Sequence, residues 1–227
     1  EARVTAERAD EGFRPDLGSI LLAEEPEGVR VDSSIATGSE IGPWYDSLLA
    51  KVIAQGDDRA QARQRLEAAL REYVILGPAT TLPFLADAVA QPIFAAGEAT
   101  TAFIAEAFPD GWAEPVPPAL ALPIAAVLRS MAAMSLPDGT PWGGLRGFRI
   151  LGPAGAVSKV GLLLDSGSAR EPVTVQSLGG SDWRVVHGEA ERSVWVRASG
   201  SGFEVEENSG LRSGRWAVAG DQVHIWL

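Results

Sequence analysis

The first residues of the chain include charged side chains that are capable of chemistry. Arg3 stands between Glu1 and Glu7 in the segment Glu-Ala-Arg-Val-Thr-Ala-Glu. A guanidinium keeps its charge at any working pH and binds planar anions through two N–H groups at once. Arg3 is therefore a candidate contact for a bound oxyanion. The alternative, which the spacing alone favours, is a surface ion pair between Arg3 and one of the two glutamates.

Other groups that do chemistry are scarce. The chain has no cysteine, which excludes disulfides and thiolate chemistry and fits a cytoplasmic or organelle-matrix protein without requiring either. The two histidines, His187 and His224, are far apart and lack a metal-binding spacing, so no metal site is predicted. The sequence has no Walker loop, no GxGxxG, no GxSxG and no HExxH motif.

Three further charged residues have a structural interpretation that outweighs a functional one. Asp46 follows two aromatic residues and is placed to cap a turn, although it is also placed to orient a site. Lys51 lies in an apolar strand pattern, which is typical of a paired or snorkelling lysine. We expect Arg30 to form a structural or interface ion pair. None of these three is predicted to be catalytic.

The elements that must position Arg3 are a mixture of strands and helices up to Phe108. Alternating polar and apolar residues predict a strand at the start of the chain, and Asp57 or Asp58 is placed to cap a helix with an apolar stripe. The predicted strands are 1–7, 18–22, 29–35 and 47–54, and the predicted helices are 57–73, 80–90 and 100–108.

The second half of the sequence has a different texture. A proline-rich linker at 109–118 precedes an apolar helix at 119–135, with Pro123 in its first turn. Only strands follow, separated by glycine-containing turns, and their number and spacing predict a closed barrel or a sandwich. The eight predicted strands are 148–151, 157–164, 173–177, 183–187, 193–197, 203–207, 215–218 and 222–227. The fold class is α+β, a mixed α/β lobe followed by an eight-stranded antiparallel β-barrel with an associated apolar helix.

Charge separates the same two parts. The net charge is −11, which argues against nucleic acid and anionic membranes as partners, and no apolar run is long enough to span a bilayer. Residues 1–108 hold 18 acids and 9 bases, giving −9, whereas residues 109–227 hold 12 acids and 10 bases, giving −2. We therefore predict two domains, 1–108 and 109–227.

Several motifs in the first domain occur together in one known family. They are Glu1-Ala2-Arg3-Val4-Thr5-Ala6-Glu7, Gly12-Phe13-x-Pro15, Gly18-x-Ile20, Gly28-Val29-Arg30-Val31-Asp32, Pro43-x-Tyr45-Asp46-Ser47-Leu48-Leu49-Ala50-Lys51 and Asp58-Arg59-x3-Arg63-x-Arg65-Leu66. Over residues 1–106 the sequence resembles the C-terminal lobe of biotin carboxylase in acyl-CoA carboxylases. One departure is Thr80-Thr81 before Phe84-Leu85, where the family usually has Thr-Asn.

The resemblance implies a catalytic and substrate-binding role for Arg3, as the arginine that contacts bicarbonate and the ureido group of biotin. Carboxylation at the ureido nitrogen requires its deprotonation, which places negative charge on the ureido oxygen. A fixed guanidinium aimed at that oxygen would stabilise the transition state. The chain itself has no biotinyl-lysine, because neither Lys51 nor Lys159 lies in the Met-Lys-Met pattern.

The second domain has a less specific counterpart. Pro141-Trp142-x3-Arg146-Gly147-Phe148-Arg149 and the strands that follow are similar to the domain that links the carboxylase to the biotin carrier in 3-methylcrotonyl-CoA-type carboxylases. That domain is a barrel around an apolar helix, and it docks on the carboxyltransferase. Four tryptophans of the second domain are expected to lie in its core, and the less favoured alternative is a role as interface anchors. They are Trp183, Trp195, Trp216 and Trp226.

The resemblance therefore predicts a fragment of a biotin-containing subunit that is inactive alone. ATP and Mg would be bound by a segment absent from this chain, and biotin would be carried on another. The implied partners are the carboxyltransferase (beta) subunit and the biotin carrier domain, in a hetero-oligomer. Two alternatives stay open: a non-catalytic assembly scaffold or tether, and a small-molecule-binding barrel in which the apolar helix covers a cavity. The sequence favours 3-methylcrotonyl-CoA or a related branched substrate over propionyl-CoA only through the Pro-Trp…Gly-Phe-Arg pattern.

Overall fold

The computed structural model describes residues 1–134, 159–165, 170–207 and 210–227. Contacts divide the chain into two compact units, Glu1–Val116 and Pro117–Leu227. The domain boundary predicted after Phe108 lies earlier in the chain than the observed boundary, because residues beyond Phe108 still pack on the first unit. Each unit has its own core.

A small antiparallel sheet carries the start of the chain. It has the order β1-β8-β6, with bounds Ala2–Thr5, Leu48–Ile53 and Arg30–Ser33. Ala2 pairs with Val52, and Val52 pairs in turn with Val31. The alternation of buried and exposed residues along β1 confirms the strand predicted there.

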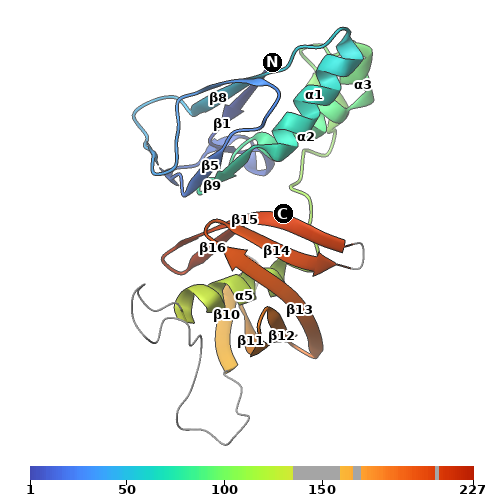
Figure 1. Ribbon diagram of the computed structural model, residues 1–227. Coiled ribbons are helices and arrows are strands. Elements are labelled where there is room, and N and C mark those ends of the chain that lie inside the picture. The colour runs from blue at the N-terminus through green and yellow to red at the C-terminus, as the bar shows by residue number, and fades with distance from the viewer. Residues whose placement is uncertain (135–158, 166–169, 208–209) are drawn as a thin grey trace, which may run out of the picture. The chain divides into compact units, whose positions relative to one another are not determined.

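Two helices cover one face of this sheet (Figure 1). The helix α1 spans Arg59–Glu72 and begins at Asp58, whose side chain accepts a hydrogen bond from the Gln61 amide, as predicted. The helix α2 spans Leu82–Ala90. Apolar side chains from both helices form one core with the sheet: Ala2, Val4, Ala50, Val52, Leu66, Ala69, Leu70, Tyr73, Leu82, Ala86 and Val89.

Short elements complete the first unit. Two helices, α3 and α4, follow α2; α4 falls inside a predicted helix, whereas α3 was not predicted. The 3-10 helix Ala9–Glu11 lies between β2 and β3. The remaining bounds are β2 Glu7–Arg8, β3 Arg14–Pro15, β4 Gly18–Ser19, β5 Leu22–Glu24, β7 Glu40–Ile41, β9 Val74–Leu76, α3 Pro92–Ala96 and α4 Phe103–Ala107, with β2-β3, β4-β7 and β5-β9 paired.

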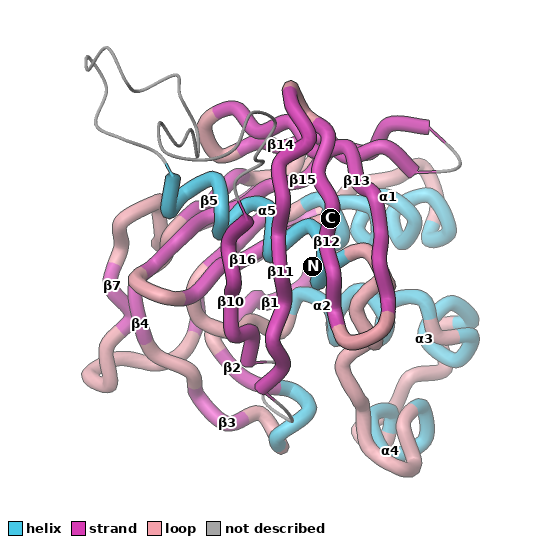
Figure 2. Tube along the Cα trace, turned by 90° about the horizontal axis from the view of Figure 1, so that it is seen from below, coloured by secondary structure: helices cyan, strands magenta, loops and turns pink. Residues whose placement is uncertain are grey.

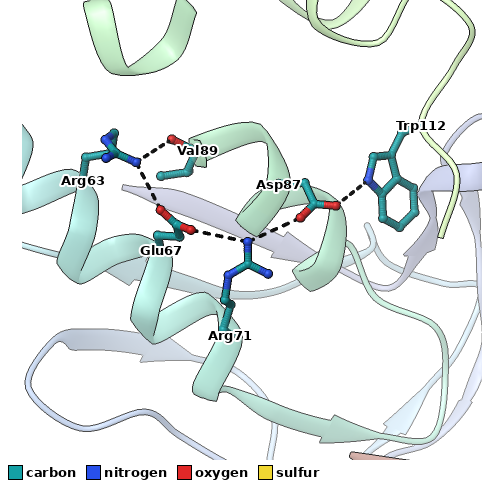
Figure 3. A network of polar contacts seen from close by, with 6 residues as sticks. All are labelled: Arg63, Glu67, Arg71, Asp87, Val89 and Trp112. Carbon is teal, nitrogen blue, oxygen red and sulfur yellow. Dashed lines mark hydrogen bonds and ion pairs between the residues drawn. The ribbon is translucent and has the colours of Figure 1, made fainter. Parts of the chain in front are cut away.

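A polar network fastens the residues after α4 to the two main helices (Figure 3). The indole Nε1 of Trp112 donates to Asp87 Oδ2 at 3.0 Å, and the other oxygen of Asp87 lies 3.5 Å from Arg71 Nη2. Arg71 also pairs with Glu67, which pairs with Arg63. The Trp112 ring meets Phe84 edge-on at 5.9 Å. This anchor explains why the first unit extends past Phe108.

Replacing Trp112 by phenylalanine should loosen this anchor. The substitution keeps an aromatic ring against Phe84 but removes the hydrogen bond to a partly exposed carboxylate. We expect α2 amides to lose about 1 kcal/mol of protection in hydrogen exchange, and about 2–3 kcal/mol in Trp112→Ala. The control is Trp44→Phe, because Trp44 is 86% exposed and should change protection by less than about 0.5 kcal/mol. Equal protection in all three variants would contradict the anchor.

The second unit is a curled antiparallel sheet around one helix (Figures 1 and 2). Its order is β10-β11-β12-β13-β14-β15-β16, so every strand pairs with its neighbour in sequence. The bounds are β10 Lys159–Asp165, β11 Arg170–Gly179, β12 Asp182–His187, β13 Ala190–Ser199, β14 Gly202–Glu207, β15 Gly210–Ala219 and β16 Gln222–Trp226.

These strands correspond to seven of the eight predicted ones, whereas 148–151 lies outside the described residues. In the described ranges no pairing joins β16 to β10. A curled sheet is therefore observed, and closure into an eight-stranded barrel stays a prediction.

The helix α5, Ala121–Met134, supplies the centre of the second core. It contacts β10, β11, β12, β13, β15 and β16. Its side chains Ile124, Val127 and Leu128 are fully buried, so this helix fills the inside of the curl. The predicted helix is confirmed, with Pro123 in the first turn, where its missing N–H costs no helical bond.

Tryptophans of this unit divide between the two faces of the sheet. Trp183 is buried in the core and Trp216 packs against it. Trp195 alternates with the buried Val194 and Val196, so it belongs to the outer face, where Arg197 lies 5.5 Å from its ring centroid. The core interpretation thus holds for Trp183 and not for Trp195.

One glycine of this sheet is fixed by its neighbours. Gly214 on β15 is the direct partner of Phe203 on β14. A β-carbon at Gly214 would lie 2.3 Å from Phe203 Cζ and 2.6 Å from the Trp226 carbonyl oxygen. The ring of Phe203 therefore occupies the space that any larger residue would need.

Candidate functional site

Arg3 lies on the sheet face opposite the helices. Its neighbours Ala2 and Val4 are buried in the core, whereas Arg3 itself is exposed. The direct cross-strand partner of Arg3 is Lys51, and the partner of Lys51 on the other side is Asp32. Directly opposed residues of an antiparallel sheet share a face, so these three charged residues form one row across β1, β8 and β6.

The strand that carries Arg3 is fixed at its far end. The Thr5 amide donates to Thr81 Oγ1 at 3.0 Å, and the Thr81 amide donates to the Thr5 carbonyl at 3.0 Å. Thr81 precedes α2 as expected, but its hydroxyl caps no helix because it is bonded to Thr5. Glu7 accepts hydrogen bonds from Thr5 and from Ser47. Arg3 therefore projects from a backbone with little freedom to move.

The carboxylate of Asp32 is fully engaged by Arg30. Arg30 Nε donates to Oδ1 at 2.9 Å, and Nη2 donates to Oδ2 at 2.8 Å. This hydrogen-bonded pair holds the pKa of Asp32 below its usual range, and the charge of Lys51 acts in the same direction. Asp32 is thus the partner of Arg30, for which an ion pair was predicted.

Arg3 makes no ion pair with either neighbouring glutamate in the part of the chain that the structure describes. Glu7 is occupied by the two hydroxyl groups of Thr5 and Ser47. The guanidinium is thus presented to solvent with its fork of donors unused, the state that contact with an anion requires.

The loop before β8 ends close to this strand. Trp44 and Tyr45 are 86% and 92% exposed, so they contribute no core packing. Asp46 Oδ1 accepts a hydrogen bond from the Leu48 amide at 3.3 Å, which is the turn-capping role weighed for it. The Ala6 amide donates to the Ser47 carbonyl at 2.8 Å and holds the loop against the chain after β1.

A buried tyrosine, Tyr73, lies in the core beneath the sheet and not at the site. Tyr73 is 2% exposed, and burial raises the pKa of its hydroxyl, so it stays neutral at physiological pH.

The described ranges hold neither a cluster of metal-binding side chains nor a helix that could span a membrane. In these residues no three His, Asp or Glu side chains are grouped to hold a metal ion. No helix in the same ranges is long and apolar enough to cross a membrane.

The site is thus an unpaired arginine on a rigid sheet backed by two helices, an arrangement suited to contacting an anion. Residues 1–106 match the family described as the biotin carboxylase C-terminal domain. This part of the chain is therefore similar to a biotin carboxylase C-terminal domain.

Two similar proteins are consistent with this family match. The chain is 41% identical over 116 residues to the mitochondrial propionyl-CoA carboxylase alpha chain of Caenorhabditis briggsae, covering 49% of this chain and 16% of that protein. It is 43% identical over 108 residues to the biotin carboxylase of Nostoc sp., covering 47% of this chain and 24% of that protein. The chain therefore spans between a sixth and a quarter of the lengths of these relatives.

A solved structure supports the fold. The complete multifunctional pyruvate carboxylase from Rhizobium etli aligns with a TM-score of 0.51 at 32% identity, covering 59% of this chain and 12% of that one.

Sequence reasoning singled out Arg3 as a candidate but did not predict how its surroundings are arranged. The Arg30–Asp32 fork was not predicted, although a strand spacing of two places both residues on one face. Lys51 was expected to be paired or snorkelling, yet it forms no ion pair in the ranges described. No local signal in the sequence indicates that Lys51 lies opposite Arg3, because this depends on the register of strands far apart in the chain.

Proposed function

We propose that this chain is part of the biotin carboxylase component of an acyl-CoA carboxylase. Arg3 acts in its carboxylation site, as the residue that contacts bicarbonate and the ureido oxygen of biotin. The observation that carries the proposal is the unpaired guanidinium of Arg3 on a fixed strand of a biotin carboxylase C-terminal domain.

The chemistry suits such an arginine. Removing the proton from the ureido nitrogen shifts negative charge to the ureido oxygen, where a pre-positioned guanidinium stabilises the charge without reorganising. The core packing of Ala2 and Val4 on either side of Arg3 supplies the pre-positioning.

The unit Pro117–Leu227 is proposed to dock on the carboxyltransferase subunit. Its outer face carries Trp195 with Arg197 above the ring, and large aromatic and arginine side chains are enriched in protein interfaces. The core of this unit is filled by α5, which favours a docking module over a barrel that binds a small molecule.

The remaining components would come from outside this chain. ATP and Mg would be bound by another segment, and biotin would be carried on a biotin carrier domain. We therefore expect no ATP-dependent biotin carboxylation by the isolated chain. A cytoplasmic hetero-oligomer is proposed, and the finer choice of 3-methylcrotonyl-CoA rests on Pro141–Arg149, which lies outside the described residues.

The test is a blot of the native source lysate with an antibody raised against this chain and a streptavidin probe in parallel. The expected result is a single band, much larger than the 23.9 kDa of this chain, that both probes detect. A streptavidin-negative band near 23.9 kDa would overturn the proposal and favour a stand-alone assembly scaffold or tether.

A further inference from the structure

A hollow lies beside the start of α5 in the second unit. Its volume is about 380 Å³, within the range of about 300–1,000 Å³ that is usual for small-molecule sites. One wall is formed by the residues that lead into α5 and by its first turn, and the other by the ends of β12 and β13. Because α5 fills the centre of the curl, the hollow has room for a short ligand and not for a long chain.

The helix side of the hollow is apolar and poor in hydrogen-bond donors. Its lining residues there are Pro117, Pro118, Leu122 and Pro123. The buried Val185 lines the hollow from β12. A proline has no backbone N–H, so the three prolines offer a polar ligand group no donor. Such a wall stabilises the hydrocarbon part of a ligand by removing it from water.

Two nitrogen-bearing side chains face the hollow from the sheet. Arg192 is the direct cross-strand partner of Val185, and His187 is the partner of Val173. Both valines are buried in the core, and directly opposed residues of an antiparallel pair share a face. Arg192 and His187 therefore belong to the inner face of the sheet, the face that packs on α5, and both line the hollow.

The charge of Arg192 is available to a ligand. In the ranges that the structure describes, Arg192 forms no ion pair, and no acidic side chain is among the described residues that line the hollow. The outer face of the same two strands is different, because Arg184 pairs there with Glu191 and Arg197 pairs with Glu204. A guanidinium beside an apolar wall matches a ligand with a carboxylate at one end and a hydrocarbon group at the other.

We propose that this hollow is a binding site for a small aliphatic monocarboxylate. The guanidinium of Arg192 binds both carboxylate oxygens through two parallel N–H groups. The hydrocarbon chain lies against the wall that Leu122 and the prolines form. Binding at this site involves no residue of the first unit, so it does not depend on the role proposed for Arg3.

The two histidines of the chain make the site readable by NMR. His187 lines the hollow, whereas His224 on β16 is not among its lining residues and serves as the internal reference. The 227-residue chain, labelled with ¹⁵N at histidine, is titrated with sodium hexanoate at pH 7 and constant ionic strength. Sodium acetate has the same charge without the chain, and hexanol has the chain without the charge.

The expected result is a saturable shift of the His187 imidazole signals at millimolar hexanoate, with no saturable shift of His224. Arg192→Gln should weaken the apparent affinity by about fivefold or more, because it removes a charge-assisted pair of hydrogen bonds. The matched control is Arg197→Gln, which removes the same charge from the outer face of the same strand. It should leave the affinity within about twofold.

A second variant tests the hollow without touching its charge. Ala190 is exposed and lines the hollow, so Ala190→Trp places an indole there without disturbing the core, and it should abolish the His187 response. Unchanged amide signals in β14 and β15 would show that this variant is folded.

Several results would overturn the site. Acetate as effective as hexanoate would mean that the apolar wall takes no part, and hexanol as effective as hexanoate would remove the role of Arg192. Equal losses in the Arg192 and Arg197 variants, or equal shifts of His187 and His224, would show a general charge or solvent effect. A full response in the folded Ala190→Trp variant would place binding elsewhere.

Discussion

Replacing Arg3 by methionine in the full-length carboxylase subunit should lower kcat for biotin carboxylation by about 10²- to 10³-fold. The loss should fall mainly on kcat, because charge on the ureido oxygen develops in the transition state and not in bound biotin. Arg3→Lys should recover part of the rate, since it restores the charge without the planar fork. The measurement is steady-state kinetics with free biotin, ATP and bicarbonate.

A matched control is available in the same unit. Arg14 is exposed and pairs with Glu11, so Arg14→Met removes one positive charge away from the row of Arg3, Lys51 and Asp32. It should leave kcat within about twofold, because a surface ion pair contributes less than about 1 kcal/mol. Similar losses in the Arg3 and Arg14 variants would show a general charge effect and would remove the catalytic role of Arg3.

Gly214→Ala should destabilise the second unit by about 2–3 kcal/mol. The new β-carbon would meet the Phe203 ring at 2.3 Å and the Trp226 carbonyl at 2.6 Å, so either the ring or the strand must move. Urea unfolding followed by hydrogen exchange in β14 and β15 gives the free energy of unfolding for this unit. The double variant with Phe203→Leu should show a favourable coupling of about 1 kcal/mol, because the shorter side chain vacates the space.

Gly161→Ala is the matched control for that experiment. Gly161 is also a strand glycine in the same sheet, but a β-carbon there would have nothing within 4 Å. It should be neutral, or stabilising by about 0.5 kcal/mol, because alanine loses less backbone entropy than glycine in a strand. Equal destabilisation at both positions would mean that the sheet disfavours alanine in general and that the Phe203 ring is not what makes Gly214 necessary.

Local patterns in the sequence were sufficient for most elements of the fold. The Asp58 cap, the apolar helix α5 and the alternation of β11 to β16 are each determined by neighbouring residues, and each was predicted. The short α3 was missed because it is little more than one turn, with Pro92 as its first residue and Gly97 as the cap after its last.

The site was predictable only in part, for a related reason. Arg3 is a candidate because of the family motifs, whereas its row with Lys51 and Asp32 depends on pairing between β1, β8 and β6. The Trp112–Asp87 bond likewise joins residues that are distant in sequence. Contacts of this kind leave no period in the sequence, so neither composition nor spacing reveals them.

Strand connectivity has a consequence for how the chain reaches its native state. In β10 to β16 each strand pairs with the next, whereas Ala2 must find Val52 and Leu22 must find Leu76. Local hairpins close quickly, whereas the pairing of distant strands costs more chain entropy before the stabilising contacts form. During synthesis the first unit leaves the ribosome earlier. The first unit, whose topology folds more slowly, therefore has the longer time to fold. The sheet of the second unit emerges later and needs little time.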